Sequence, residues 1–61
     1  PDAYKVLGLD PGAADAEVRS RYRELLKKLH PDTAGTRGTG YLLKLVIAAY
    51  QQIAKERKWH Q

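Results

Sequence analysis

The sequence predicts an all-α domain in which a short helix packs on a hairpin of two longer ones. Apolar residues recur at steps of three and four over residues 15–29 and 41–57, as on one face of an α-helix. No segment alternates apolar and polar residues as a half-buried strand does. A loop of about nine residues (32–40), rich in Gly and Thr, joins the two segments, so we expect an antiparallel hairpin with facing apolar stripes.

The first short helix is expected over residues 3–8. Tyr4 and Leu7 lie three positions apart and so share one side of a helical turn. Gly8 is suited to ending the helix because glycine tolerates a positive φ. Asp10, Pro11 and Gly12 then predict a turn, after which the short helix can pack across the hairpin.

The helix over 15–29 carries an apolar stripe and a basic stripe side by side. The apolar stripe comprises Val18, Tyr22, Leu25 and Leu29. The basic stripe comprises Arg19, Arg23 and Lys27, which recur every four residues. Acidic residues occupy the first turn and basic residues the last, as the helix dipole favours. Pro31 ends the helix and biases His30 away from helical dihedral angles.

The helix over 41–57 has an apolar arc of about 200°, wider than one contact face needs. Its expected core side is formed by Leu43, Val46, Tyr50 and Ile53, with Leu42 and Ala49 beside them. Residues 58–61 are expected to be a frayed end. Two interpretations remain open for Leu45, Ile47 and Trp59. Ile47 can flank the core while Trp59 packs loosely, or the three can form an exposed patch that contacts the parent protein or a second copy.

Composition narrows the class of protein. The chain has 61 residues, 11 Lys+Arg, 7 Asp+Glu, a formal net charge of +4 and no cysteine. This length allows one domain, which we expect to span 1–61 as part of a longer protein, and makes an enzymatic cleft hard to build. Without cysteine there is no disulfide or zinc-thiolate site, and no apolar run reaches the ~18 residues of a membrane span. We therefore expect a cytoplasmic location.

The tripeptide His30-Pro31-Asp32 admits two interpretations. In the first interpretation, the tripeptide only ends the helix: Pro31 stops it, His30 complements its dipole and Asp32 begins a turn. As a binding element, the rigid proline holds an exposed carboxylate in place, which suits it to capturing an arginine of a partner protein.

Residues 2–32 resemble the start of a J domain, the module of the DnaJ-type co-chaperones. The resemblance is carried by a Tyr before Leu-Gly-hydrophobic, a small-residue turn, an acidic helix start, a basic helix with Tyr-Arg, and His-Pro-Asp. The apolar and Ala-Tyr positions of the second long helix continue it, so that it covers about residues 2–54.

The resemblance implies a module that is not an enzyme. A J domain docks on a DnaK-type chaperone in its ATP state and stimulates ATP hydrolysis there. Asp32 would pair with an arginine of the chaperone, and His30 and Pro31 would shape the loop. The full set of implied partner contacts is His30, Pro31, Asp32, Arg19, Arg23, Lys27, Lys28 and Tyr22. We expect no catalytic residue, cofactor or metal, a monomer, and no nucleic-acid or membrane contact by this domain.

The chain also departs from the family pattern. Glu24 stands where the family often has a basic residue, and Arg21 where it usually has Ala. Ala14 replaces the usual Ser or Thr helix cap, so we expect Asp15 to cap one residue later. The family's fourth helix is expected to be absent or reduced to residues 55–61.

Two other functions fit a small basic helical domain. One is nucleic-acid binding with the basic helix in a groove, although Glu24 interrupts the basic face and the helix lacks Asn or Gln to read adenine. The other is a scaffold hairpin in which the His-Pro-Asp tripeptide only ends a helix. The scaffold hypothesis predicts that changes at His30 or Asp32 have no effect on function.

Overall fold

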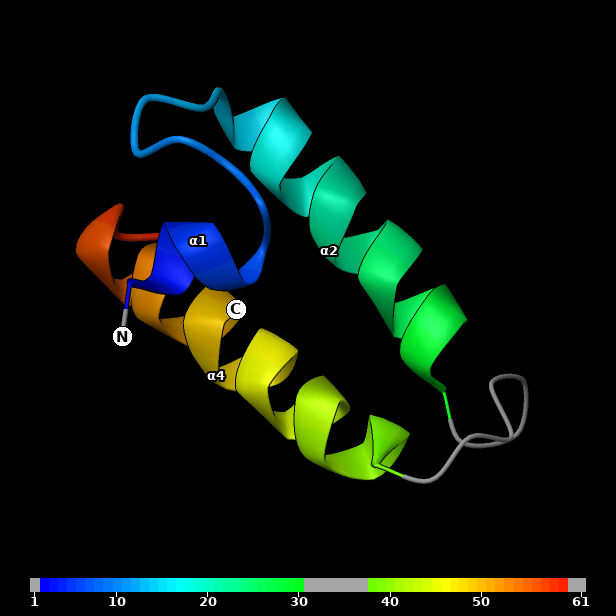
Figure 1. Ribbon diagram of the computed structural model, residues 1–61. Helices are drawn as coiled ribbons and strands as arrows, with labels where there is room; N and C mark the ends of the chain where they lie inside the picture. Colours follow the sequence, from blue (N-terminus) through cyan, green and yellow to red (C-terminus); the bar gives the residue numbers. More distant parts are fainter. Residues whose placement is uncertain (1, 31–37, 60–61) are drawn as a thin grey trace.

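The computed structural model describes residues 2–30 and 38–59 and shows an all-helical arrangement over that part of the chain. Its helices are α1 (Ala3–Val6), α2 (Asp15–Leu29) and α4 (Thr39–Glu56). The two long helices run antiparallel, and α1 lies against α4 on one side of the hairpin (Figure 1). The predicted fold class is therefore confirmed. None of the described helices is both long and apolar enough to cross a bilayer.

The core lies where α1, α2 and α4 approach one another. It consists of Ala3, Leu7, Ala13, Val18, Val46, Ala49 and Ile53. Leu7, Val18 and Ile53 are its largest fully buried side chains, and several of the other members are alanines. Tyr22 and Tyr50 close the seam between the long helices by stacking, with ring centroids 3.8 Å apart and planes 5° from parallel. Such a small apolar core leaves a small margin of stability.

Helix α1 ends earlier than predicted, at Val6 rather than at residue 8. The reason is a Schellman motif: the Leu9 amide donates to the Tyr4 carbonyl (2.9 Å) and the Gly8 amide to the Lys5 carbonyl (3.0 Å). Gly8 has φ +74°, which confirms its predicted role as the terminating residue. At the other end, the Asp2 carboxylate accepts a hydrogen bond from the Tyr4 amide.

A second Schellman motif ends α4, and it corrects the prediction of a frayed end for residues 58 and 59. The Trp59 amide donates to the Ala54 carbonyl (2.8 Å) and the Lys58 amide to the Lys55 carbonyl (3.2 Å). Lys58 adopts φ +61°, the left-handed conformation that glycine usually supplies. The chain therefore turns back, and Trp59 packs against the core. Residues 57–59 are not helical, and residues 60–61 lie outside the described residues.

Arg57 fastens this turn to the first half of the chain. Its guanidinium donates to the Tyr4 hydroxyl, the Asp15 carboxylate and the backbone carbonyls of Pro11 and Ala13. The Trp59 indole N–H donates to the other oxygen of Asp15. We call Arg57, Trp59 and Asp15 the C-terminal clasp. The prediction that Asp15 caps α2 is wrong, because Ala14 is the N-cap residue and the Asp15 oxygens face Arg57 and Trp59 instead.

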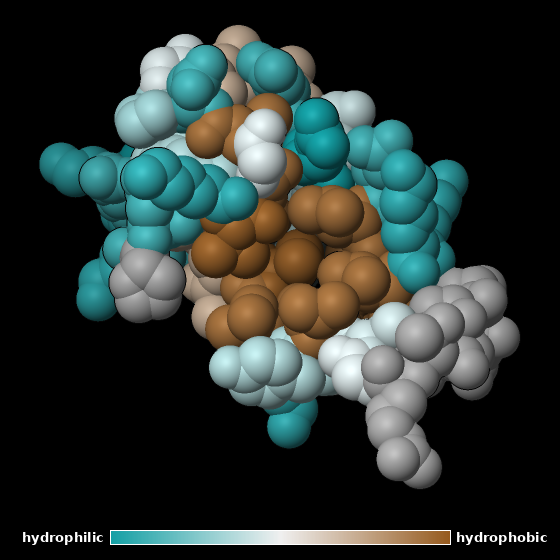
Figure 2. All heavy atoms as spheres, in the orientation of Figure 1, coloured by the Kyte–Doolittle hydropathy of each residue, from teal (hydrophilic) through white to brown (hydrophobic). Residues whose placement is uncertain are grey.

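Helix α4 begins at Thr39, two residues before the predicted start, and ends at Glu56. Thr39 and Gly40 are poor helix formers. The helix tolerates them in its first turn because later turns of α4 pack against the core and stabilise it. Tyr41, Leu42 and Leu45 remain exposed, and apolar side chains gather between α2 and α4 on the face that carries α1 (Figure 2).

The structure separates the three residues that were considered as one apolar patch. Leu45 lines a groove between α1 and α4 together with Ala3 and Val6. Trp59 packs beside Tyr50 and contacts the start of α2. Ile47 is half-buried, as expected for a residue that flanks the core. A single patch of Leu45, Ile47 and Trp59 is therefore excluded, and the expectation that Trp59 packs only loosely is wrong as well.

The two Schellman motifs predict opposite effects of substitution. We expect Gly8→Ala to lower the free energy of unfolding by about 1 kcal/mol, because a Cβ disfavours the left-handed conformation. We expect Lys58→Gly to raise it by up to about 1 kcal/mol for the same reason. Urea unfolding followed by circular dichroism measures both. If Lys58→Gly instead destabilises the domain, residue 58 does not hold the left-handed conformation in solution.

The C-terminal clasp predicts acid sensitivity. The hydrogen bond from Arg57, and then that from Trp59, holds the pKa of the Asp15 carboxyl below its usual range despite an opposing effect of desolvation. Because the folded-state pKa is depressed, the stabilisation is present above the unfolded pKa of about 3.9 and is lost as pH falls through the folded value. We expect Asp15→Asn to lower Tm at pH 7 and to reduce the further loss of Tm between pH 5 and pH 2. An unchanged acid dependence in this variant contradicts the assignment.

Candidate functional site

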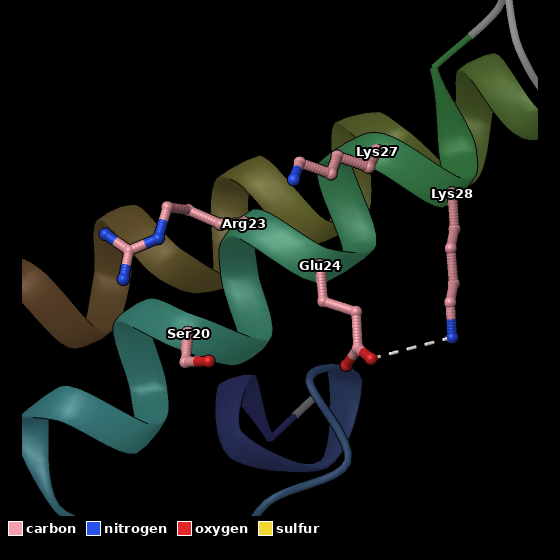
Figure 3. A pocket seen from close by; sticks show the side chains of 5 residues that line it. All are labelled: Ser20, Arg23, Glu24, Lys27 and Lys28. Atoms are coloured by element: carbon pink, nitrogen blue, oxygen red, sulfur yellow. Dashed lines mark ion pairs between the residues drawn. The ribbon is translucent and has the colours of Figure 1, made fainter.

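The exposed side of α2 is basic, as its sequence predicts. Arg19, Arg23 and Lys27 are exposed and recur every four residues along this helix. Arg23 and Lys27 point to the same side of the helix, whereas Glu24 and Lys28 approach each other on another side (Figure 3). A shallow depression between these side chains is lined by Ser20, Arg23, Glu24, Lys27 and Lys28.

Glu24 reduces the number of cations available on this surface. Its carboxylate lies 3.7 Å from the Lys28 ammonium and 3.8 Å from the Arg21 guanidinium. Both contacts are made on solvent-exposed side chains, so each contributes little to stability. Their effect is mainly on charge, because Lys28 is drawn toward a carboxylate on its own helix. Glu24 therefore divides the basic surface that the sequence predicted.

His30 marks the end of α2 that leads to the His-Pro-Asp tripeptide. It is the C-cap residue, with φ −61° and ψ 132°, and its side chain is exposed. This extended conformation is the one that a following proline imposes, as predicted. Pro31 and Asp32 lie outside the described residues. The basic face of α2 thus runs directly into the tripeptide.

Tyr22 is placed differently from the other predicted contact residues. Its ring is half-buried in the seam and stacks on Tyr50, so it belongs to the packing of the hairpin. Burial, and then the proximity of Tyr50, raises the pKa of the Tyr22 hydroxyl. A direct contact of Tyr22 with a partner stays a prediction.

Arg19 has a partner that the sequence did not indicate. Its guanidinium carbon lies 4.2 Å from the centroid of the Trp59 ring, a cation–π contact. Trp59 is half-buried and reaches α2 only because of the left-handed turn at Lys58. In the sequence, only the presence of Trp59 and Arg57 could have pointed to these contacts. Neither residue reveals that it contacts residues more than 35 positions earlier in the chain.

These groups form an exposed, mainly basic surface along α2. No group of three His, Cys, Asp or Glu side chains comes together in the described part of the chain as a metal site would require. The arrangement offers exposed guanidinium and ammonium donors, which bind carboxylates through charge-assisted hydrogen bonds. A surface of this charge is complementary to an acidic one.

Comparison with known proteins agrees with this description. The family model described as the DnaJ domain matches residues 2–61. The chain is 38% identical over 58 residues to the chaperone protein DnaJ of Acetivibrio thermocellus, and 42% identical over 57 residues to that of Lactobacillus acidophilus. In each case the match covers 93% of this chain and 15% of the relative.

A further relative is the co-chaperone protein DjlA of Coxiella burnetii, 42% identical over 55 residues, which cover 88% of this chain and 20% of that protein. The chain thus spans only a small part of the length of these relatives. No solved structure gives a significant match. The match of the family model over residues 2–61, on a helical hairpin with a basic second helix, shows that the chain belongs to the DnaJ-domain family.

Proposed function

We propose that this domain is a co-chaperone module that docks on a DnaK-type chaperone in its ATP-bound state and stimulates ATP hydrolysis by that chaperone. The observation that carries the proposal is the exposed basic face of α2, which ends at His30 in an extended conformation. Membership of the DnaJ-domain family supports the choice of partner. The hydrolytic chemistry belongs to the partner, so this chain contributes binding energy and orientation.

The proposed docking has an electrostatic part and a specific part. The stripe of Arg19, Arg23 and Lys27 attracts an acidic surface from a distance, which raises the rate of encounter and makes it sensitive to salt. The specific part is a pair between Asp32 and an arginine of the chaperone, with His30 and Pro31 shaping the loop. Because α2 leads directly to His30, binding along the helix delivers the tripeptide to a fixed place on the partner.

The tripeptide provides the first test. We expect His30→Gln and Asp32→Asn each to reduce stimulation of single-turnover ATP hydrolysis by a bacterial DnaK at least tenfold. Removing one member of a desolvated charge pair typically costs about 2–5 kcal/mol in binding. Circular dichroism should show that both variants remain folded, and His30 is exposed and lies outside the core of the described residues.

Asp10→Asn is the matched control, because it removes an exposed carboxylate from the other interhelical connection. It should stimulate like the wild type. If the wild type stimulates and the two tripeptide variants do so equally well, the proposed role of the tripeptide is wrong. If the wild type fails to stimulate any of several DnaK-type chaperones, the proposed function itself is wrong.

Glu24 provides a second test. Glu24→Gln removes one negative charge from the exposed side of α2 and releases Lys28 from its ion pair. We therefore expect association with DnaK to become about two- to fivefold faster at low salt. The gain should disappear at about 0.5 M salt, where the Debye length is only a few ångströms. Stopped-flow mixing with fluorescently labelled DnaK measures the rate.

Glu17→Gln makes the same change in net charge in the first turn of α2, where no lysine is paired with it in the described residues. We expect a smaller acceleration from this variant. Equal acceleration by both variants means that only net charge matters and that the local release of Lys28 has no effect.

A further inference from the structure

Three acidic residues of α2 (Asp15, Glu17 and Glu24) lie four positions before a basic residue, and among the described residues only Glu24 forms an ion pair at this spacing. Glu24 approaches Lys28 at 3.7 Å, as i,i+4 pairs do. Asp15 stands in the same relation to Arg19, yet no ion pair or hydrogen bond between them exists in the described structure. The two carboxylates are similarly exposed, at 53% for Asp15 and 50% for Glu24. Solvent exposure therefore does not explain the difference.

At Asp15, the C-terminal clasp occupies the carboxylate. Arg57 binds Oδ1 of Asp15, and the Trp59 indole N–H donates to Oδ2 at 3.2 Å. Both oxygens are thus engaged by residues from the far end of the chain. Among the causes that lower the pKa of Asp15, the hydrogen bond from Arg57 is the largest and the attraction of Arg19 the smallest. Arg19 remains near this carboxylate without being captured by it.

Arg19 rests on the Trp59 ring instead. A guanidinium that lies over an aromatic face keeps its N–H donors in its own plane, where they can still bind carboxylates. The ring that supports it is itself fixed. Trp59 packs beside Tyr50, with centroids 5.7 Å apart, and its backbone closes the Schellman turn. The arginine side chain is therefore restrained but its hydrogen-bonding capacity is not used.

We propose that Trp59 is a positioning residue for partner docking: it occupies Asp15 and supports Arg19, and so keeps the Arg19 guanidinium available to an acidic partner. This inference rests on the proposed function, because Arg19 is taken as a docking residue. It extends the set of residues that support docking to Trp59, beyond the C-terminal end of α4. Restraining a long side chain before binding lowers the entropy lost on binding, which strengthens docking.

A double-mutant cycle tests the proposal, with the affinity for ATP-bound bacterial DnaK as the readout. We expect Arg19→Gln to weaken binding about tenfold and Trp59→Leu about threefold. The double variant should be no weaker than Arg19→Gln alone, because Trp59 acts through Arg19. Arg23 is the matched control, because among the described residues it makes no cation–π contact with Trp59. The effects of Arg23→Gln and Trp59→Leu should multiply.

Two further variants distinguish positioning from a general structural role. Trp59→Phe keeps a ring beneath Arg19 and should retain most of the affinity. Adding Asp15→Asn to Trp59→Leu should restore part of the lost affinity, because no carboxylate then remains to capture Arg19. A purely structural role predicts the opposite, since Asp15→Asn removes a further clasp contact and destabilises the fold. Circular dichroism measures that stability for every variant.

A measurement without any partner completes the test. In the NMR spectrum, the Trp59 ring should shift the Arg19 side-chain protons upfield, and Trp59→Leu should abolish the shift. If the shift is present but wild type does not bind DnaK, the proposed function fails and the Trp59–Arg19 contact stands. If wild type binds but the Arg19 and Trp59 effects multiply as those of Arg23 and Trp59 do, the positioning role is overturned and the proposed function stands.

Discussion

The structure depends on Arg57 more than on any single apolar contact. The core is small, and outside Leu7, Val18, Val46 and Ile53 it is built from alanines. One guanidinium, whose side chain is only 18% exposed, joins α1, the connection between α1 and α2, and the first turn of α2. The hydrogen bond to Tyr4, and then that to Asp15, raises the pKa of Arg57, so it remains charged at any physiological pH. The carbonyls that it binds belong to a connection that has no helical partners for them.

This arrangement gives the two ends of the hairpin different tasks. At one end, Arg57 and Trp59 bind Asp15 in the first turn of α2, and Arg57 also binds carbonyls of the connection that precedes this helix. At the other end, α2 continues into His30. Lys27, Lys28 and His30 at that end are exposed. The hydrogen bonds of the C-terminal clasp are thus concentrated at the end of the hairpin opposite His30.

The sequence predicted the helices and the basic stripe, because both follow from periodicities of three to four residues that any helix must obey. The residue types also predicted the turn at Gly8 and the extended His30. The clasp was not predictable in this way. Lys58 adopts the left-handed conformation that glycine usually supplies. Because the residue is a lysine, the sequence did not predict that the chain turns back there toward the core. The pairing of Arg57 with Asp15 spans 42 positions and leaves no local pattern. The local sequence around Asp15 therefore predicted, wrongly, that this residue caps α2.

The placement of acids on a basic helix determines how many of its cations remain available. Glu24 and Asp15 are equivalent by spacing, yet the first draws in Lys28 while the second leaves Arg19 unpaired on its own helix. Unlike Glu24, Asp15 is bound through both of its carboxylate oxygens by Arg57 and Trp59. A count of charges along α2 therefore does not tell whether Arg19 and Lys28 are available to an acidic partner. A contact made by the last residues of the chain decides whether a cation near the start of α2 is presented outward or neutralised within its own helix.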